Sequence, residues 1–305
     1  MANTIDSSLQ LTEILDSALT AFKRAVVPLN AFSTVYADVA LQGDDTVDVP
    51  YYPLATDASA SRNADGSYKA LVTDTDTQVK TITIDTNKVQ GLSFTGRERA
   101  RQPVFDPEKH GMIKGEKLGY DIVADVLSVV TAANFAGSTI AASAAADFDE
   151  EDVADLAQLC DEAEWSSIGR SLILNPAFHY NLVKQPAILD RSQSGSNSLN
   201  TGDLPNIMGF TTFCSNGVPA NGAENIAGFA VTDSAILCAF APVPPSDGVR
   251  QLLVDYQQVT DPDTGATLEY KRIAYPDTDE EAQFIEAHYG YAVGEAAALK
   301  RVTTT

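Results

Sequence analysis

Cysteine is scarce in this 305-residue chain, and the three that occur are widely spaced. Cys160, Cys214 and Cys238 are too few, and odd in number, for a disulfide framework. Each lies among apolar neighbours, so we expect small buried side chains and not reactive thiols. The scarcity also indicates that the chain folds in a reducing compartment, the cytoplasm.

Histidine is equally scarce, and the usual motifs of enzymes are missing. His110, His179 and His288 lie far apart, and none has a partner at metal-ligand spacing. There is no nucleophile elbow and no phosphate-binding glycine pattern. Residues 261–265 begin like a calcium loop, but Arg272 stands where that loop needs a glutamate, so turn chemistry explains them. We therefore expect no catalytic residue, no cofactor and no metal.

Long apolar runs are absent too. No stretch approaches the run of about 18 apolar residues that a membrane span needs. The polar, acidic first ten residues lack the basic start and apolar centre of a signal peptide. We therefore expect neither a membrane span nor export. Because 44% of the residues are hydrophobic, the chain can still bury a core large enough for two domains or one elaborate domain.

Basic residues are outnumbered, and they are unevenly placed. The net charge is −22, from 42 acids and 20 bases, which disfavours binding to a phosphate backbone. Six of the 20 bases lie between residues 97 and 117, whereas residues 118–169 contain eleven acids and no Lys or Arg. Such polarity suits a molecule that presents different charges to different surroundings, although ordinary solvated surface also explains any single face.

The N-terminal region has the pattern of an amphipathic helix. Its apolar residues recur at helical spacing, at Leu11, Ile14, Leu15, Ala18, Leu19, Phe22, Ala25 and Val26. Lys23 and Arg24 suit the negative end of such a helix, and Pro28 ends it. A helix with one apolar stripe must dock, either on its own body or on a neighbour.

The next region predicts two strands, 34–41 and 46–52, and then a long polar segment. Residues 55–77 consist largely of Asp, Ser, Thr, Ala, Asn and Gly, including the sequence Asn63-Ala64-Asp65-Gly66. A loop of this length is unusual inside a compact domain and usually has a function or is disordered. The segment cannot fold on a core of its own, so we expect that it either stays free or is ordered by another molecule.

Alternation then predicts strands at 79–84 and 89–94, followed by a long helix. Asp106-Pro107-Glu108 is a strong helix start, and one apolar stripe continues from Leu118 to Ala133. We predict a helix over 107–134, with Gly111, Gly115 and Gly119 weakening its first half enough to bend or break it.

The remaining chain mixes helices with short strands. The acidic run 147–152 predicts the start of a helix, and Asn175-Pro176 predicts the start of another over 177–185. The predicted strands are 171–174, 210–213, 225–231, 235–240, 252–258, 268–274, 283–290 and 293–302, with the two around the 261–265 turn forming a hairpin.

This order of elements resembles the Hong Kong 97-like fold of tailed-bacteriophage major capsid proteins, and the resemblance spans essentially the whole chain. It is carried by residues 78–94, the 107–134 helix, and the step Leu172-Ile173-Leu174-Asn175-Pro176. The segments 208–219 and 228–240 add to it. The resemblance implies an α+β fold with an N-terminal arm (1–40), an extended loop that is a β-hairpin (41–77) and a peripheral domain (78–146) with a spine helix (107–134). It also implies an α/β axial domain (147–272) and strands that return to the peripheral domain (273–305).

The resemblance also implies a function, partners and contact residues. The chain would assemble with itself into hexamers and pentamers of an icosahedral shell, in the host cytoplasm, around DNA held without sequence-specific contact. A portal and cement or decoration proteins would be partners. Because the sequence has no room for a fused scaffolding segment, the resemblance implies either a separate scaffolding protein or none. The predicted subunit-interface residues are Leu15, Phe22, Arg62, Lys69, Arg97, Arg99 and Arg101. Lys69 could form a covalent cross-link, although a solvated lysine is the simpler interpretation.

Two other functions remain open. An encapsulin-type bacterial nanocompartment shell has the same fold and would bind a tagged cargo enzyme. A soluble enzyme or a carbohydrate-binding β-rich protein ranks third, because no motif supports a site.

Deletion of residues 55–77 tests the interpretation of the polar segment. Because the segment has no core of its own, we expect the shortened monomer to stay folded and soluble while its assembly is weakened or blocked. Circular dichroism would report the fold, and sedimentation would report assembly. Unfolding of the shortened monomer would show that the segment belongs to the core.

Overall fold

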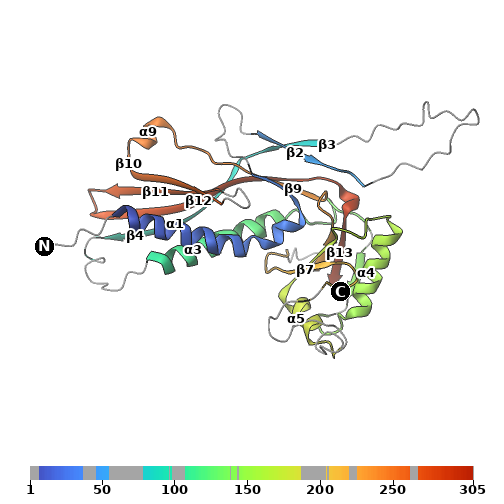
Figure 1. Cartoon of the computed structure of the whole chain (residues 1–305). Helices are drawn as coiled ribbons and strands as arrows, with labels where there is room; N and C mark the ends of the chain where they lie inside the picture. The colour runs from blue at the N-terminus through green and yellow to red at the C-terminus, as the bar shows by residue number, and fades with distance from the viewer. Residues whose placement is uncertain are drawn as a thin grey trace, which may run out of the picture.

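The computed structural model describes residues 7–36, 46–54, 78–95, 97, 107–137, 139–142, 144–186, 204, 206–219, 225–261 and 267–304. Over these residues the chain is an α+β structure with two sheets and a separate two-stranded ribbon (Figure 1). The helices are α1 (Ser7–Ala25), α3 (Pro107–Leu127), α4 (Glu150–Glu162), α5 (Pro176–Lys184) and α9 (Asp247–Arg250), with short 3-10 helices at Val27–Ala31 and Ala296–Ala298. None of the described helices is long and apolar enough to span a membrane.

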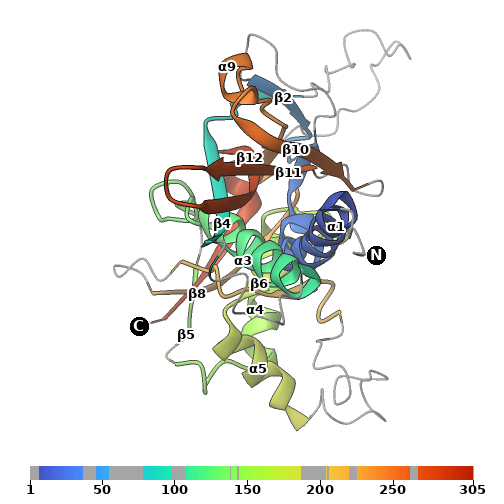
Figure 2. The same cartoon turned by 90° about the vertical axis from the view of Figure 1, so that its left-hand side faces the viewer.

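The larger sheet has six strands in the order β1-β9-β12-β11-β10, with β4 also paired to β12. These strands are β1 (Ser33–Tyr36), β4 (Thr86–Thr95), β9 (Ile236–Phe240), β10 (Leu253–Thr260), β11 (Thr267–Tyr275) and β12 (Glu280–Val293). Alternate residues of β11 and β12 point to one face, which α1 and α3 cover side by side (Figure 2). Strand β1 corresponds to the start of the strand predicted at 34–41. It pairs in parallel with β9 and not with β2, the next strand in the sequence.

The smaller sheet has five strands in the order β5-β13-β8-β6-β7. They are β5 (Thr139–Ala142), β6 (Ser171–Leu174), β7 (Thr211–Cys214), β8 (Ile226–Val231) and β13 (Leu299–Thr304). Every residue of β6 and β8 is buried, because both faces of these strands are covered. Leu172 and Leu174 pack with α4 and α5, whereas Ile173 and Phe229 join the core around α1 and α3.

The two predicted helix starts in this region are confirmed by their caps. The side chain of Asp149 accepts hydrogen bonds from the backbone of Glu151 and Asp152, and Asp152 reciprocates on the backbone of Asp149, which completes a capping box. Asn175 caps α5 by accepting from the backbone of Ala177 at 3.0 Å. Both starts were readable because capping depends only on neighbours in sequence.

The predicted domain limits at 146/147 and 272/273 do not match the sheets. Strands β9, β10 and β11 fall in the predicted axial segment but belong to the six-stranded sheet. Strand β13 falls in the predicted return to the peripheral domain but lies in the five-stranded sheet, between β5 and β8. The sheets do not follow these sequence limits because the chain passes between the two sheets more than once, and pairing partners are distant in sequence.

The long helix also differs from its prediction. It ends at Leu127 and not at residue 134, because the next residues tighten into turns: Ser128 N donates to Asp125 O as well as to Ala124 O, and Val130 N donates to Leu127 O. Those turns bury Val130 and Phe135 in the same core as the helix. The apolar stripe beyond Leu127 therefore reflects burial of a turn, not continued helix.

The glycines of α3 do not break the helix. Gly111, Gly115 and Gly119 follow one another at intervals of four and face α1, where an added Cβ would overlap with Ile14, Ala18 and Ala25 respectively. Glycine therefore lets the two helix backbones approach closely. A buried ion pair adds to the attachment of α1, because Lys23 Nζ lies 2.5 Å from the carboxylate of the fully buried Asp261 at the end of β10.

Substitution of Gly115 by alanine measures this close approach. Alanine favours an isolated helix by about 1 kcal/mol, but here the new Cβ would overlap with backbone atoms of Ala18. We expect a net loss of about 1–3 kcal/mol in the free energy of unfolding, measured by urea denaturation of the unassembled subunit. Gly248→Ala in α9 is the matched control, because nothing lies within 4 Å of its added Cβ. Equal stability of the two variants would contradict the close packing.

Candidate functional site

A two-stranded ribbon carries the segment that the sequence marks as unable to fold alone. Strands β2 (Thr46–Tyr51) and β3 (Gln78–Thr83) pair antiparallel, from Thr46 opposite Thr83 to Tyr51 opposite Gln78. The Tyr51 hydroxyl donates to Gln78 Oε1 at 2.6 Å, at the end from which the chain leaves the ribbon. Residues 55–77, with Arg62 and Lys69, lie outside the described residues. Strand β2 falls within the predicted extended loop (41–77), and β3 begins directly after it.

The base of the ribbon is anchored by an apolar face. Val47, Val49, Ile82 and Ile84 pack against residues of β9 and of the chain just after it, namely Leu237, Ala239 and Ala241. The opposite face and the outer end carry exposed apolar side chains, with Tyr52 71% and Val79 57% exposed. The ribbon therefore has a fixed inner face and a free outer surface.

Two further contacts set how the ribbon lies on the sheet. Gly290 of β12 lies under Thr83, where an added Cβ would overlap with the Thr83 carbonyl oxygen. Beyond β2, the backbone N–H of Leu54 donates to Glu295 Oε2 at 2.7 Å. The sequence analysis did not single out Gly290 or Glu295. A glycine between two tyrosines inside an alternating strand is a usable signal, because such a glycine often marks the close approach of another backbone.

Opposite charges meet at one end of the six-stranded sheet. Thr95 at the end of β4 pairs with Glu280 at the start of β12, and Arg97 follows two residues later with an exposed side chain. The turn before β12 carries the exposed Asp277 and Asp279. Arg97 therefore follows the end of β4 that pairs with the start of β12, where the acidic turn ends. Arg99 and Arg101 lie outside the described residues.

The structure corrects the prediction for Leu15 and Phe22. Both side chains are buried in the core of their own subunit, 0% and 1% exposed, where α1 packs on α3. They are therefore not surface contact residues. The helix satisfies its apolar stripe within the chain, which was one of the two possibilities that the sequence left open.

A polar network that the sequence did not reveal holds β4, α3 and β12 together. Lys88 Nζ lies 2.8 Å from Asp125 Oδ2, and the Tyr289 hydroxyl donates to the same oxygen at 2.7 Å. The hydrogen bond with Asp125 raises the pKa of Lys88, and burial raises the pKa of Tyr289 above its usual value. The network fixes the strand that begins beside the acidic turn and passes under the ribbon.

Comparison with known proteins gives no match to any family model or curated protein. Solved structures nevertheless match most of the chain. The capsid of cyanophage P-SCSP1u shares 12% identity over 92% of this chain and 88% of its own, with a TM-score of 0.57. The capsid of an empty GTA particle shares 15% identity over 92% and 90%, with a TM-score of 0.54. A virus-like particle from Pyrococcus furiosus shares 14% identity over 95% and 98%, with a TM-score of 0.53.

These similarities concern the arrangement of the backbone, because the sequences have diverged to identities of 12–15%. They extend across both sheets and leave little of either chain unmatched. The chain therefore has the α+β fold of the subunits of these capsids and of this virus-like particle.

Proposed function

We propose that this chain is the structural subunit that self-assembles into the icosahedral capsid of a tailed bacteriophage, around double-stranded DNA. The observation that carries the proposal is the shared fold, which covers 92% of the chain in the match to the cyanophage capsid. A ribbon with a fixed base and the exposed apolar side chains of Tyr52 and Val79 supports it further, because a neighbouring subunit would cover such side chains.

The finer assignment is the Hong Kong 97-like fold. In this proposal, the β2–β3 ribbon is the base of the extended loop, and α3 is the spine helix. The six-stranded sheet with α1 and α3 contains the peripheral domain, and the five-stranded sheet with α4 and α5 is the axial domain. The element order and the two separate sheets support this assignment.

The charge of the chain fits a container for DNA. With a net charge of −22, the subunit repels a phosphate backbone, so packaged DNA would stay mobile and would be neutralised mainly by small ions. The proposed partners are other copies of the chain in hexamers and pentamers, a portal, a separate scaffolding protein, and cement or decoration proteins. The proposed location is the virion capsid, after assembly in the host cytoplasm.

An encapsulin-type nanocompartment shell is the second candidate. The match to the virus-like particle from Pyrococcus furiosus favours it, since it covers 95% of this chain and 98% of that one. A tagged cargo enzyme inside the particle would identify a nanocompartment, and a portal at one vertex would identify a phage capsid.

Electron microscopy of the expressed chain, alone and with candidate scaffolding proteins, tests the shell function. We expect closed particles of uniform size, because assembly lets neighbouring subunits cover the exposed apolar side chains of each copy. Persistent monomers that bind a small molecule tightly would contradict the proposal.

Charge reversal at Arg97 tests the charged end of the sheet as a subunit contact. If Arg97 pairs with acids of a neighbour, Arg97→Glu should raise the critical concentration for assembly several-fold, because attraction becomes repulsion. Light scattering at low and moderate salt would measure the effect, and the defect should shrink as salt rises.

Lys184→Glu is the matched control, because it makes the same charge change at an exposed residue at the end of α5. An equal defect in this control would attribute the effect to net charge alone. A normal critical concentration for Arg97→Glu would exclude Arg97 from the contact.

A further inference from the structure

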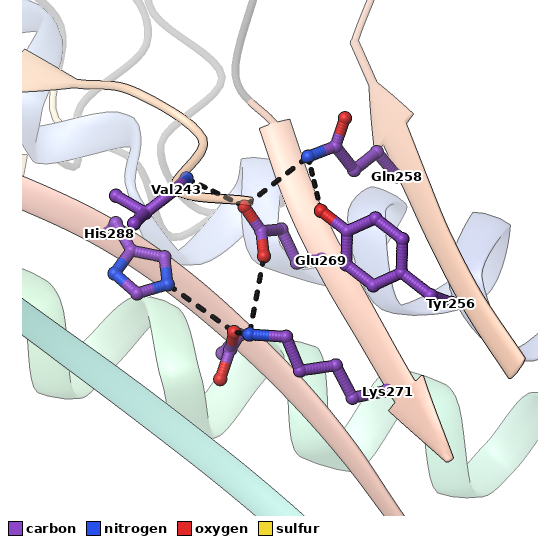
Figure 3. Close-up of polar contacts among 7 residues, drawn as sticks. Val243, Tyr256, Gln258, Glu269, Lys271 and His288 are labelled. Carbon is purple, nitrogen blue, oxygen red and sulfur yellow. Dashed lines mark hydrogen bonds and ion pairs between the residues drawn. The ribbon is translucent and has the colours of Figure 1, made fainter. Parts of the chain in front are cut away.

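A cluster of charged side chains is buried on the face of the six-stranded sheet opposite α1 and α3 (Figure 3). Alternation puts Leu268 and Tyr270 of β11 toward the helices, so Glu269 and Lys271 point the other way. On β12, Ile285 and Ala287 face the helices, so alternation puts Glu286 and His288 on the side of the cluster. The backbone N–H of Val243 donates to Glu269 Oε1 at 2.8 Å, from the chain segment that follows β9.

The sheet register brings two carboxylates together. Glu269 and Glu286 are directly opposite each other in the β11–β12 pair, and His288 is two residues further along β12 on the same face. One ligand atom from each of these three residues lies within 4.8 Å of the other two. Like charges at opposite positions destabilise a sheet, so this arrangement needs a cation.

The protein supplies only one cation to this cluster among the described residues. The Lys271 ammonium pairs with Glu286 and lies 3.5 Å from Glu269 Oε2, which is longer than a charged hydrogen bond of about 2.7–2.9 Å. His288 Nε2 lies 3.3 Å from Glu286 Oε1, so the imidazole adds a ligand nitrogen beside the two carboxylates. Two carboxylates therefore face a single ammonium.

One carboxylate oxygen of the cluster lacks a hydrogen bond. Glu269 is only 1% exposed, and its Oε2 has no hydrogen-bond partner among the described residues. Its other oxygen accepts from Val243 N at 2.8 Å and lies 3.4 Å from Gln258 Nε2. A buried carboxylate oxygen without a hydrogen bond is costly, and here it is directed toward Lys271 (Figure 3).

We propose that Glu269, Glu286 and the Nε2 of His288 form a binding site for a divalent transition metal ion, with Lys271 as the substitute cation when no metal is bound. Zinc fits this ligand set best, because one imidazole and two carboxylates leave a fourth position for water. Magnesium and calcium prefer all-oxygen sites, so the imidazole disfavours them. The proposal does not depend on the shell function.

The exchange of cations needs only side-chain movement. The Lys271 side chain is 17% exposed, so its ammonium can turn toward solvent while its stem stays in place. The ligands come from two paired strands, so the backbone already holds them together. Because the ligand positions 269 and 286 are 17 apart in sequence, the unfolded chain would bind the ion more weakly, and zinc would stabilise the folded subunit.

Calorimetric titration of the full-length, unassembled, chelator-treated chain with ZnCl2 tests the proposal. We expect one zinc ion per chain, weak heat with MgCl2, and a rise in the thermal unfolding midpoint with zinc. Lys271→Met removes the competing ammonium, so it should bind zinc about tenfold more tightly. His288→Ala should abolish the binding, and His110→Ala, on α3 and outside the cluster, should not change it.

Two outcomes would exclude the proposed metal site. Zinc binding that persists unchanged in His288→Ala would place the ion elsewhere, and absence of binding by both the native chain and Lys271→Met would exclude the site. If Lys271→Met does not fold, as judged by circular dichroism, Glu269→Gln replaces it and must lower the zinc affinity. Binding is measured on single subunits, so a failure of assembly would leave this result intact.

Discussion

Strand β12 is the constraint on which the rest of the structure depends. Its fourteen residues pair with β4, β11 and β9, and one face of the strand contributes Ile285, Ala287 and Tyr289 to the core over α1 and α3. The same strand begins beside the acidic turn and passes under the ribbon at Gly290. A rigid, fully paired strand thus fixes the spatial relation between the charged end of the sheet and the ribbon.

The subunit buries some of its apolar surface within its own chain and leaves other surfaces exposed. The amphipathic helix α1 buries its stripe against α3, and the lower face of the ribbon is buried on β9. The outer ribbon surface and the charged end of the sheet are exposed. A subunit of this kind buries the apolar stripe of α1 within the chain and still has surfaces that another copy can cover, which agrees with the proposed shell function.

Much of the local structure was predictable from the sequence, whereas the contacts that several residues make were not. The start of α4 at the acidic run and the start of α5 at Asn175 were read correctly, because caps act within a few residues. The glycines of α3 were read as weak points, yet they are contact points for α1. Leu15 and Phe22 were read as contacts with another subunit, because an apolar stripe does not reveal whether its partner is on the same chain.

The sequence by itself determined the element types, the long polar segment, the acidic charge and the resemblance to a capsid fold, because periodicity, capping and composition are local properties. Only the tertiary structure decided which strands share a sheet, and so where the domain limits fall. It also brought Glu269, Glu286 and His288 together across two strands and placed Arg97 after the end of β4 that pairs with the start of β12. Strand register sets these neighbours, and it arises from the packing of residues that are far apart in the chain.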